Sequence, residues 1–151
     1  MRLLGVRARS RAEMRDRLTQ KGFSPDEVSA TIDRLDRWDL LDDEQFAADW
    51  VRARHAGSGR GRLALRRELR AKGVDDETIS EALAQIDPDR EREIAQEIAV
   101  KKLAVRGEAL GDRDEWNRAY RRLTGVLGRR GFPPEMITSV VGEVLAEARE
   151  A

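Results

Sequence analysis

The densest group of side chains that could bind a partner is a basic run. Residues 52–72 contain eight Arg or Lys side chains and one acid, Glu68, a net charge of +7. Arg62, Arg66 and Arg70 recur at every fourth residue and would form one ridge on a helix. Such a ridge can neutralise phosphates or bind a carboxylate-rich partner. The candidate partner- or DNA-binding residues are Arg52, Arg54, Arg60, Arg62, Arg66, Arg67, Arg70 and Lys72.

The basic ridge and the glycine-rich segment before it can each be interpreted in two ways. The ridge could be a solvated face that serves only solubility, but a charge of +7 over 21 residues exceeds what solubility needs. The glycine-rich segment Gly57–Gly61 could hold phosphates. It lacks the Gly-Lys-Ser/Thr ending of a nucleotide-binding loop and has no predicted strand before it. We therefore interpret it as a flexible linker.

Nothing in the sequence assembles a catalytic set. His55 is the only histidine and stands beside Arg54 at a predicted helix end, which favours a surface or capping role. The carboxylates alternate with arginines or occupy first turns of helices, where the helix dipole explains them. The chain has no cysteine, so a disulfide, a thiolate zinc site and a cysteine nucleophile are excluded. We predict a protein that is not an enzyme and needs no cofactor or metal.

The charges are segregated along a chain whose net charge is zero. Residues 24–51 and 75–97 each carry nine acids against two bases, and residues 101–130 carry nine bases against four acids. This alternation predicts separate positive and negative faces rather than a uniformly basic nucleic-acid binder. The sequence contains neither a signal peptide pattern nor a membrane-spanning apolar run. We expect a cytoplasmic protein that does not contact a membrane.

The elements that would position these side chains form a repeat. Gly22, Gly73 and Gly131 each follow a basic residue and precede an apolar one. Apolar residues recur eight and four positions before each glycine and six, ten and thirteen positions after it. This pattern predicts a helix that ends at the glycine, followed at once by a second amphipathic helix. The matching apolar residues are Met14, Leu18, Val28, Ile32 and Leu35; Leu65, Leu69, Ile79, Leu83 and Ile86; and Leu123, Leu127, Ile137, Val141 and Val144.

The fold class that follows is all-α, with tandem repeats of short three-helix bundles in an elongated, curved array. Capping motifs such as Ser24-Pro25-Asp26-Glu27 support the predicted helix starts. Helices are expected at about 10–21, 25–37, 43–55, 60–72, 76–86, 88–106, 113–130 and 134–149. We place the repeat boundaries at 1–56, 57–107 and 108–151.

Two helices joined by a tight turn are also typical of sequence-specific DNA readers. A reading helix normally presents Arg, Lys, Asn or Gln at its exposed N-terminal positions. Here the helices after the glycines begin with Asp26-Glu27, Asp76-Glu77 and Glu135, which phosphates would repel. Sequence-specific recognition of duplex DNA is therefore disfavoured.

Several motifs together resemble the RecX family. Arg7-Ala8-Arg9-Ser10-Arg11-Ala12-Glu13-Met14, with Leu18 and Lys21-Gly22-Phe23, is similar to the opening motif of that family. The stretch from Leu41-Asp42-Asp43 through Phe46-Ala47 to Arg54 resembles its most distinctive segment. Gly61-Arg62-Leu63 through Lys72-Gly73-Val74 resembles the next block, and residues 123–144 fit more loosely. The lead-in usual before the first motif is missing.

The resemblance implies a regulator of the RecA recombinase, built from tandem three-helix repeats and without a cofactor. Such proteins bind the RecA–DNA filament and inhibit its ATPase, recombinase and coprotease activities, which affects DNA repair, recombination and the SOS response. We accordingly expect RecA and its filament as partners, with weak direct DNA contact and a monomeric state. Two alternatives stay open from sequence: a helical DNA-binding or nucleoid-type protein that acts without RecA, and an adaptor for another protein.

Overall fold

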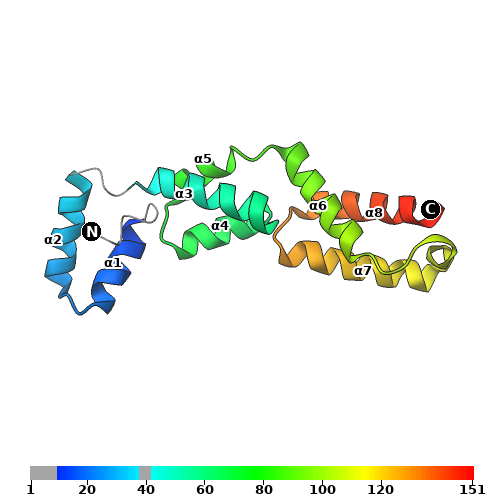
Figure 1. Ribbon diagram of the computed structural model, residues 1–151, viewed down its shortest axis with the longest axis horizontal. Helices are drawn as coiled ribbons and strands as arrows, with labels where there is room; N and C mark the ends of the chain where they lie inside the picture. The colour runs from blue at the N-terminus through cyan, green and yellow to red at the C-terminus, as the bar shows by residue number, and fades with distance from the viewer. Residues whose placement is uncertain (1–9, 38–41) are drawn as a thin grey trace. The chain divides into compact units, whose positions relative to one another are not determined.

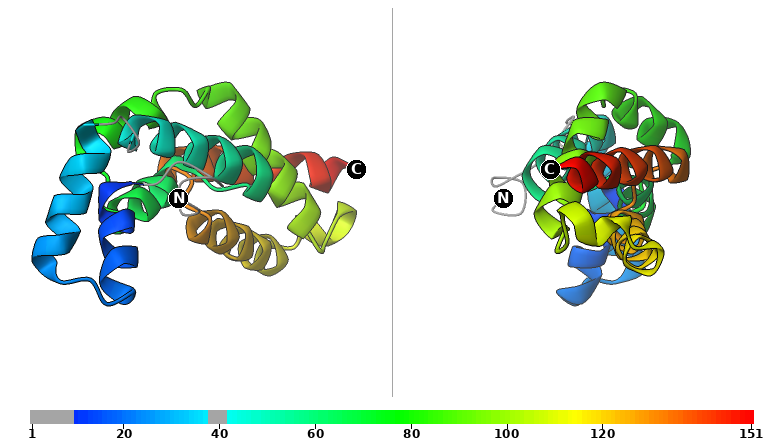
Figure 2. Two further views of the ribbon diagram at one scale, coloured as in Figure 1. Left: turned by 60° about the vertical axis from the view of Figure 1, so that its left-hand side comes forward. Right: turned by 90° about the vertical axis from the view of Figure 1, so that its right-hand side faces the viewer.

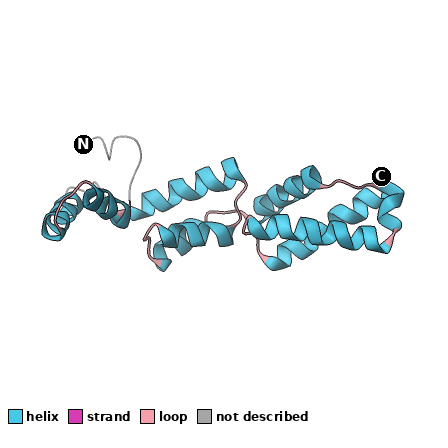
Figure 3. Ribbon diagram, turned by 90° about the horizontal axis from the view of Figure 1, so that it is seen from below, coloured by secondary structure: helices cyan, strands magenta, loops and turns pink. Residues whose placement is uncertain are grey.

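The computed structural model describes residues 10–37 and 42–151, which form helices joined by short loops (Figure 1). No strand occurs within these ranges (Figure 3), which agrees with the predicted all-α class. Arg7, Ala8, Arg9 and Leu41 of the RecX-like motifs lie outside the described residues. The α-helices are α1 (Arg11–Gln20), α2 (Pro25–Arg37), α3 (Asp43–Arg52), α4 (Arg62–Ala71), α5 (Asp76–Leu83), α6 (Pro88–Lys102), α7 (Arg113–Arg129) and α8 (Pro134–Glu150), with a π-helical turn η1 (Ala53–Gly57) and a 3-10 turn η2 (Gly107–Gly111).

The helix starts follow the capping residues read from the sequence. At α2, Ser24 Oγ accepts the Glu27 N–H at 3.2 Å, and Glu27 Oε1 accepts the Ser24 N–H at 3.1 Å. These bonds lower the pKa of Glu27 from its ordinary value, because they stabilise the charged carboxylate. Asp75 caps α5 by accepting the Thr78 N–H at 2.8 Å, and its pKa is lowered for the same reason.

The described helices form two compact units. Unit 1 comprises the chain up to Ala53 together with Arg66–Gln85, and unit 2 comprises Arg54–Leu65 together with Ile86–Ala151. In unit 1, α1 and α2 form a hairpin (Figure 2), and α3 packs against α5. The hairpin encloses a small core of the predicted stripe residues: Met14, Leu18, Val28, Ile32 and Leu35.

Unit 2 has the larger core. Helices α7 and α8 pack side by side and α6 lies against both (Figure 1), while η2 closes onto α7 and α8. Leu127 and Phe132 are almost completely buried at the turn between α7 and α8. The other buried members of this core are Ile94, Ala95, Ala99, Leu110, Leu123, Ile137, Val140, Val141, Val144, Leu145 and Ala148.

The repeat boundaries at 1–56, 57–107 and 108–151 remain a prediction. The helix contacts relevant to these boundaries are those of α3 with α5 and those of α6 with α7 and α8. The apolar spacing around the glycines identifies α1 with α2, α4 with α5, and α7 with α8, but it carries no information about where α3 and α6 pack.

The three repeat glycines end α1, α4 and α7 with the same backbone turn. Their φ angles are +93°, +81° and +86° for Gly22, Gly73 and Gly131, the left-handed region that favours glycine. In each turn the residue after the glycine donates its N–H to the leucine four residues before the glycine, at 3.1–3.3 Å. The side chains that follow differ, because Val74 and Phe132 are buried whereas Phe23 is 44% exposed.

Two of these turns press against the beginning of another helix. In unit 1, a Cβ on Gly73 would overlap the Cβ of Ala12, and Ser10 Oγ donates to Lys72 O at 2.9 Å. In unit 2, a Cβ on Gly131 would overlap Ala64. Around Gly22 the same space is empty to 4 Å. Glycine is therefore required for its backbone angle at all three positions, and for close approach at Gly73 and Gly131.

A network of hydrogen bonds holds the first turn of α4 in unit 2. Gly61 N–H donates to Arg130 O at 2.8 Å and Leu63 N–H donates to Gly131 O at 2.9 Å. Between them, Arg62 donates its N–H and its Nε–H to the two carboxylate oxygens of Glu91, at 3.0 and 2.9 Å. Glu91 is fully buried, so these bonds replace the hydration that its charge has lost. Helix α4 thus begins without unsatisfied N–H groups at 61–63.

Replacing Gly73 by alanine should destabilise unit 1 more than replacing Gly22. Gly22→Ala forces a left-handed backbone on a residue with a Cβ, at a cost of about 1–2 kcal/mol. Gly73→Ala adds the overlap with Ala12, for a further ~1–3 kcal/mol. Urea unfolding followed by circular dichroism measures both variants. Equal losses of stability would contradict the close approach of Gly73 to α1.

Glu91→Gln should weaken unit 2 strongly. It leaves an amide NH₂ facing donors of Arg62 in a buried site, which should lower the free energy of unfolding by about 2–3 kcal/mol. Glu143→Gln is the matched control, since Glu143 also accepts an arginine bond, from Arg92 at 2.7 Å, but is exposed. That change should cost less than ~0.5 kcal/mol. Similar urea midpoints for the two variants would show that the buried carboxylate is not needed.

Candidate functional site

Several of the predicted site residues make ion pairs inside their own unit. Arg62 is bonded to the buried Glu91 and is 33% exposed, so its guanidinium supports α4 rather than forming an open ridge. In two of the other three pairs both side chains are exposed, whereas in the third the half-buried Lys72 lies near the buried Glu13. The three pairs are Arg52 with Asp49 at 3.3 Å, Arg70 with Asp76 at 2.9 Å, and Lys72 with Glu13 at 3.9 Å.

Lys72 has a second contact that explains its half-buried position. Its ammonium lies 5.2 Å from the centroid of the Trp50 ring, a distance at which a cation is attracted to an aromatic face. Trp50 in turn stacks on Phe46 with 5.9 Å between ring centroids. Lys72 therefore packs onto α3 in addition to carrying charge.

Arg66 and Arg67 make few polar contacts within the protein. Arg66 Nη1 lies 3.5 Å from Ser80 Oγ, a long hydrogen bond, and Arg67 is exposed. Within residues 10–37 and 42–151 neither makes an ion pair. Leu65 and Leu69 on the same helix are completely buried, as their spacing predicted. The outward part of α4 in unit 1 thus presents two cations to solvent or to a partner.

The glycine segment between η1 and α4 is ordered by several bonds, so our interpretation of it as a flexible linker is wrong. Arg60 N–H donates to Arg54 O at 3.1 Å, and Gly61 is bonded to Arg130 as described above. Arg130 Nη1 also donates to Ser58 O at 3.0 Å. A Cβ on Gly61 would come within 2.5 Å of Gly131 O, so the segment needs glycine for close packing as well as for turning.

His55 stabilises this segment from inside. Its side chain is 8% exposed, so the expected surface position is wrong, and its Nδ1 lies 2.7 Å from Arg60 O. That contact requires a proton on Nδ1, since the carbonyl can only accept. The ring therefore supports the loop, and its contact is with a loop carbonyl rather than with a helix end.

Unit 2 brings part of the basic run together with a distant basic segment. An open cleft of about 400 Å³ is lined by Arg54 and Arg60 from the run and by Lys102, Arg129 and Arg130 from the ends of α6 and α7. Ser58 and Val126 complete the lining. The last three cations were absent from the predicted site. The excess of bases in residues 101–130 was the signal that could have pointed to them, but no spacing along the sequence relates them to Arg60.

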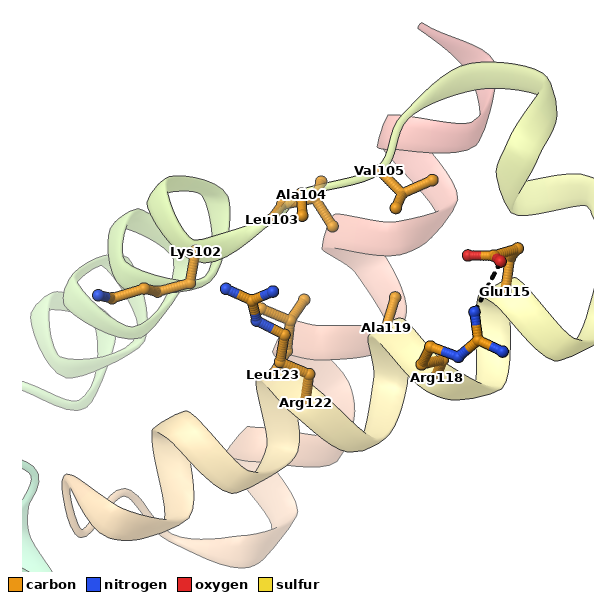
Figure 4. A pocket seen from close by; sticks show the side chains of 9 residues that line it. All are labelled: Lys102, Leu103, Ala104, Val105, Glu115, Arg118, Ala119, Arg122 and Leu123. Atoms are coloured by element: carbon orange, nitrogen blue, oxygen red, sulfur yellow. Dashed lines mark hydrogen bonds and ion pairs between the residues drawn. The ribbon is translucent and has the colours of Figure 1, made fainter.

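A second hollow on unit 2 is smaller and more apolar. It has a volume of about 110 Å³ between α7 and the segment that follows α6, and its lining includes Leu103, Val105, Ala119 and Leu123 (Figure 4). Arg118 lies at its edge and pairs with Glu115 at 2.8 Å. This volume holds a few water molecules at most and would not accept a nucleotide-sized cofactor.

The described residues contain neither a group of metal ligands nor a membrane-spanning helix. In the described ranges no group of three or more His, Asp or Glu side chains is arranged to bind a metal ion. No helix in the same residues is both long and apolar enough to cross a membrane.

Comparison with known proteins bears out the family resemblance. Residues 1–35 match the family model for the first three-helix domain of RecX, and residues 42–83 match that for the second. The regulatory protein RecX of Mycolicibacterium smegmatis is 50% identical over 152 residues, covering 99% of this chain and 79% of the relative. The RecX of Corynebacterium efficiens is 43% identical, with 98% and 70% covered.

Solved structures agree with these relatives. The crystal structure of RecX from Lactobacillus salivarius superposes with a TM-score of 0.78 at 25% identity, covering 95% of this chain and 90% of the other. A second RecX crystal structure, at 23% identity, has the same fold with a TM-score of 0.77. By sequence along nearly its whole length and by fold, the chain belongs to the RecX family, whose members are non-enzymatic regulatory proteins that modulate the RecA recombinase.

Proposed function

We propose that this protein binds the RecA–DNA filament and inhibits its ATPase, recombinase and coprotease activities. The observation that carries the proposal is the 50% identity to a RecX regulatory protein over 99% of this chain. The local net charge of +7 over residues 52–72 is consistent with binding of a partner that presents carboxylates or phosphates. The protein would act in the cytoplasm as a monomer, with weak direct contact to DNA.

The contact residues we propose are the eight cations of residues 52–72. They differ in how much of their charge is available, because Arg62 supports α4 through Glu91 while Arg66 and Arg67 make no ion pair in the described part of the chain. Arg66 and Arg67 are therefore expected to contribute most to a contact with acidic RecA surface or with filament phosphates. Arg52, Arg54, Arg60, Arg70 and Lys72 complete the proposed set.

Recognition of specific duplex sequences is less compatible with the helix starts. The helices that follow the repeat glycines begin with Asp26 and Glu27 on α2, Asp76 and Glu77 on α5, and Glu135 on α8. All five side chains are exposed, so they would face the phosphates of a bound duplex. A regulator that approaches DNA as part of a protein filament avoids inserting these acidic turns into a groove.

The ATPase activity of the cognate RecA on single-stranded DNA tests the proposed function directly. Adding this protein at fixed salt should lower the rate at stoichiometric or smaller ratios to RecA. Inhibition at very small ratios would favour capping of filament ends, because few ends exist per RecA molecule. An unchanged ATPase rate in the presence of excess folded protein would contradict the proposal.

Reversing the charges of Arg66 and Arg67 should weaken filament binding. The variant Arg66→Glu with Arg67→Glu changes the charge by −4 at the two least engaged cations of α4 and should raise the half-inhibitory concentration about tenfold or more, as for the loss of ~1.4 kcal/mol. The control is Arg15→Glu with Arg17→Glu, which makes the same charge change at exposed positions of α1. Matching circular dichroism spectra would establish that both variants fold. Equal inhibition by both would remove Arg66 and Arg67 from the contact surface.

A further inference from the structure

We infer that the cleft of unit 2 between Arg60, Lys102 and Arg129 binds phosphate groups of a single-stranded DNA backbone. This deepens the proposed function and rests on it, because the DNA of the RecA filament would be the natural ligand. The cleft is lined by five cations, one serine and one valine, and no lining residue is acidic. A second hollow of about 260 Å³ shares Ser58, Lys102 and Arg130 with it and adds Lys101 and Arg90, together with one acid, Glu97, which lies 3.7 Å from Arg90.

The cleft is held in shape by bonds between its two sides. Arg60 Nη1 lies 3.5 Å from Arg129 O, and Arg130 Nη1 donates to Ser58 O at 3.0 Å. Two glycines leave room for the arginines: a Cβ on Gly59 would lie 3.2 Å from Arg130 Nη1, and a Cβ on Gly125 would lie 3.2 Å from Arg129 Nη1. Pre-positioned cations lose less conformational entropy when they bind an anion.

Helix dipoles alone do not account for these cations. Lys102 and Arg129 occupy last turns of α6 and α7, where positive charge is generally favourable. At α7, however, the terminal carbonyls already accept bonds: Arg129 O from Arg60, Arg130 O from Gly61, and Gly131 O from Leu63. Lys102 and Arg129 make no side-chain ion pair within residues 10–37 and 42–151. Their mutual repulsion across one cleft is relieved by an anion.

The lining favours phosphates over a protein segment. Protein–protein contacts depend on apolar or aromatic anchors that fill a desolvated pocket, and Val126 is the only apolar side chain in this lining. Arginine, lysine and serine are typical partners of nucleic-acid phosphates. The lining includes no aromatic side chain on which a base could stack, so binding should be independent of base sequence.

The test measures binding of the full chain, without RecA, to a fluorescent 20-nucleotide oligo(dT) by anisotropy at several salt concentrations. Lys102→Gln with Arg129→Gln removes two proposed phosphate contacts. The plot of log affinity against log salt should become less steep by about 1.4, at ~0.7 per contact for single strands. The affinity at 0.1 M salt should fall about tenfold or more. Arg113→Gln with Arg121→Gln removes the same charge from exposed positions elsewhere on α7 and should change neither quantity.

Further arms of the experiment identify the ligand chemistry. Lys102→Arg with Arg129→Lys keeps both charges and should retain the wild-type slope. An oligonucleotide with an uncharged methylphosphonate backbone should not compete. Equal salt slopes for the variant at Lys102 and Arg129 and for the control variant would overturn the inference. It would also be overturned if the protein bound polyglutamate rather than DNA and this binding depended on Lys102 and Arg129. Inhibition of RecA is measured in a separate assay. A negative result for DNA binding would therefore leave the proposed function intact, and a lack of RecA inhibition would be recognised independently of the cleft.

Discussion

The beginning of α4 is the constraint on which the arrangement of the basic residues depends. The N–H groups of residues 61–63 precede the first intrahelical bonds of α4 and need other acceptors, which they find in Arg130 O, Glu91 and Gly131 O. Glu91 is charged and fully buried, so it in turn needs both donors of Arg62. One set of bonds therefore satisfies a helix end, a buried carboxylate and the end of α7.

This constraint also explains why glycine occurs where it does. The α4 turn can reach the α7 carbonyls only if Gly61 and Gly131 bring the two backbones into contact without a Cβ on either. The loop from Ser58 to Gly61 is then held close to the ends of α6 and α7. Arg60 and Arg130 lie on opposite sides of this contact, so the packing that stabilises unit 2 also creates the basic cleft.

The charged side chains of this protein thus have two roles, packing within a unit and availability to a partner, which the composition does not distinguish. Arg62 and Lys72 support packing, the first through Glu91 and the second through Trp50 and Glu13. Arg67, by contrast, is exposed and makes no ion pair in the described chain, and the cations of the cleft gather where no acid lines the surface. If the protein binds the RecA–DNA filament, as we propose, it needs charge that stays available to a partner, and the charges of Arg62 and Lys72 are partly used in packing.

Much of this could be predicted from the sequence because it depends on local periodicity. The helices, their caps at Ser24 and Asp75, the buried leucines and the glycine turns all follow from residues within a few positions of one another. The RecX-like motifs, which are local too, identified the family. The pairing of Arg62 with Glu91, the burial of His55 and the meeting of Arg60 with Lys102 and Arg129 join residues that no repeat spacing relates. Only the tertiary packing within unit 2 decided these contacts, because buried donors and charges take whichever acceptors the fold brings within reach.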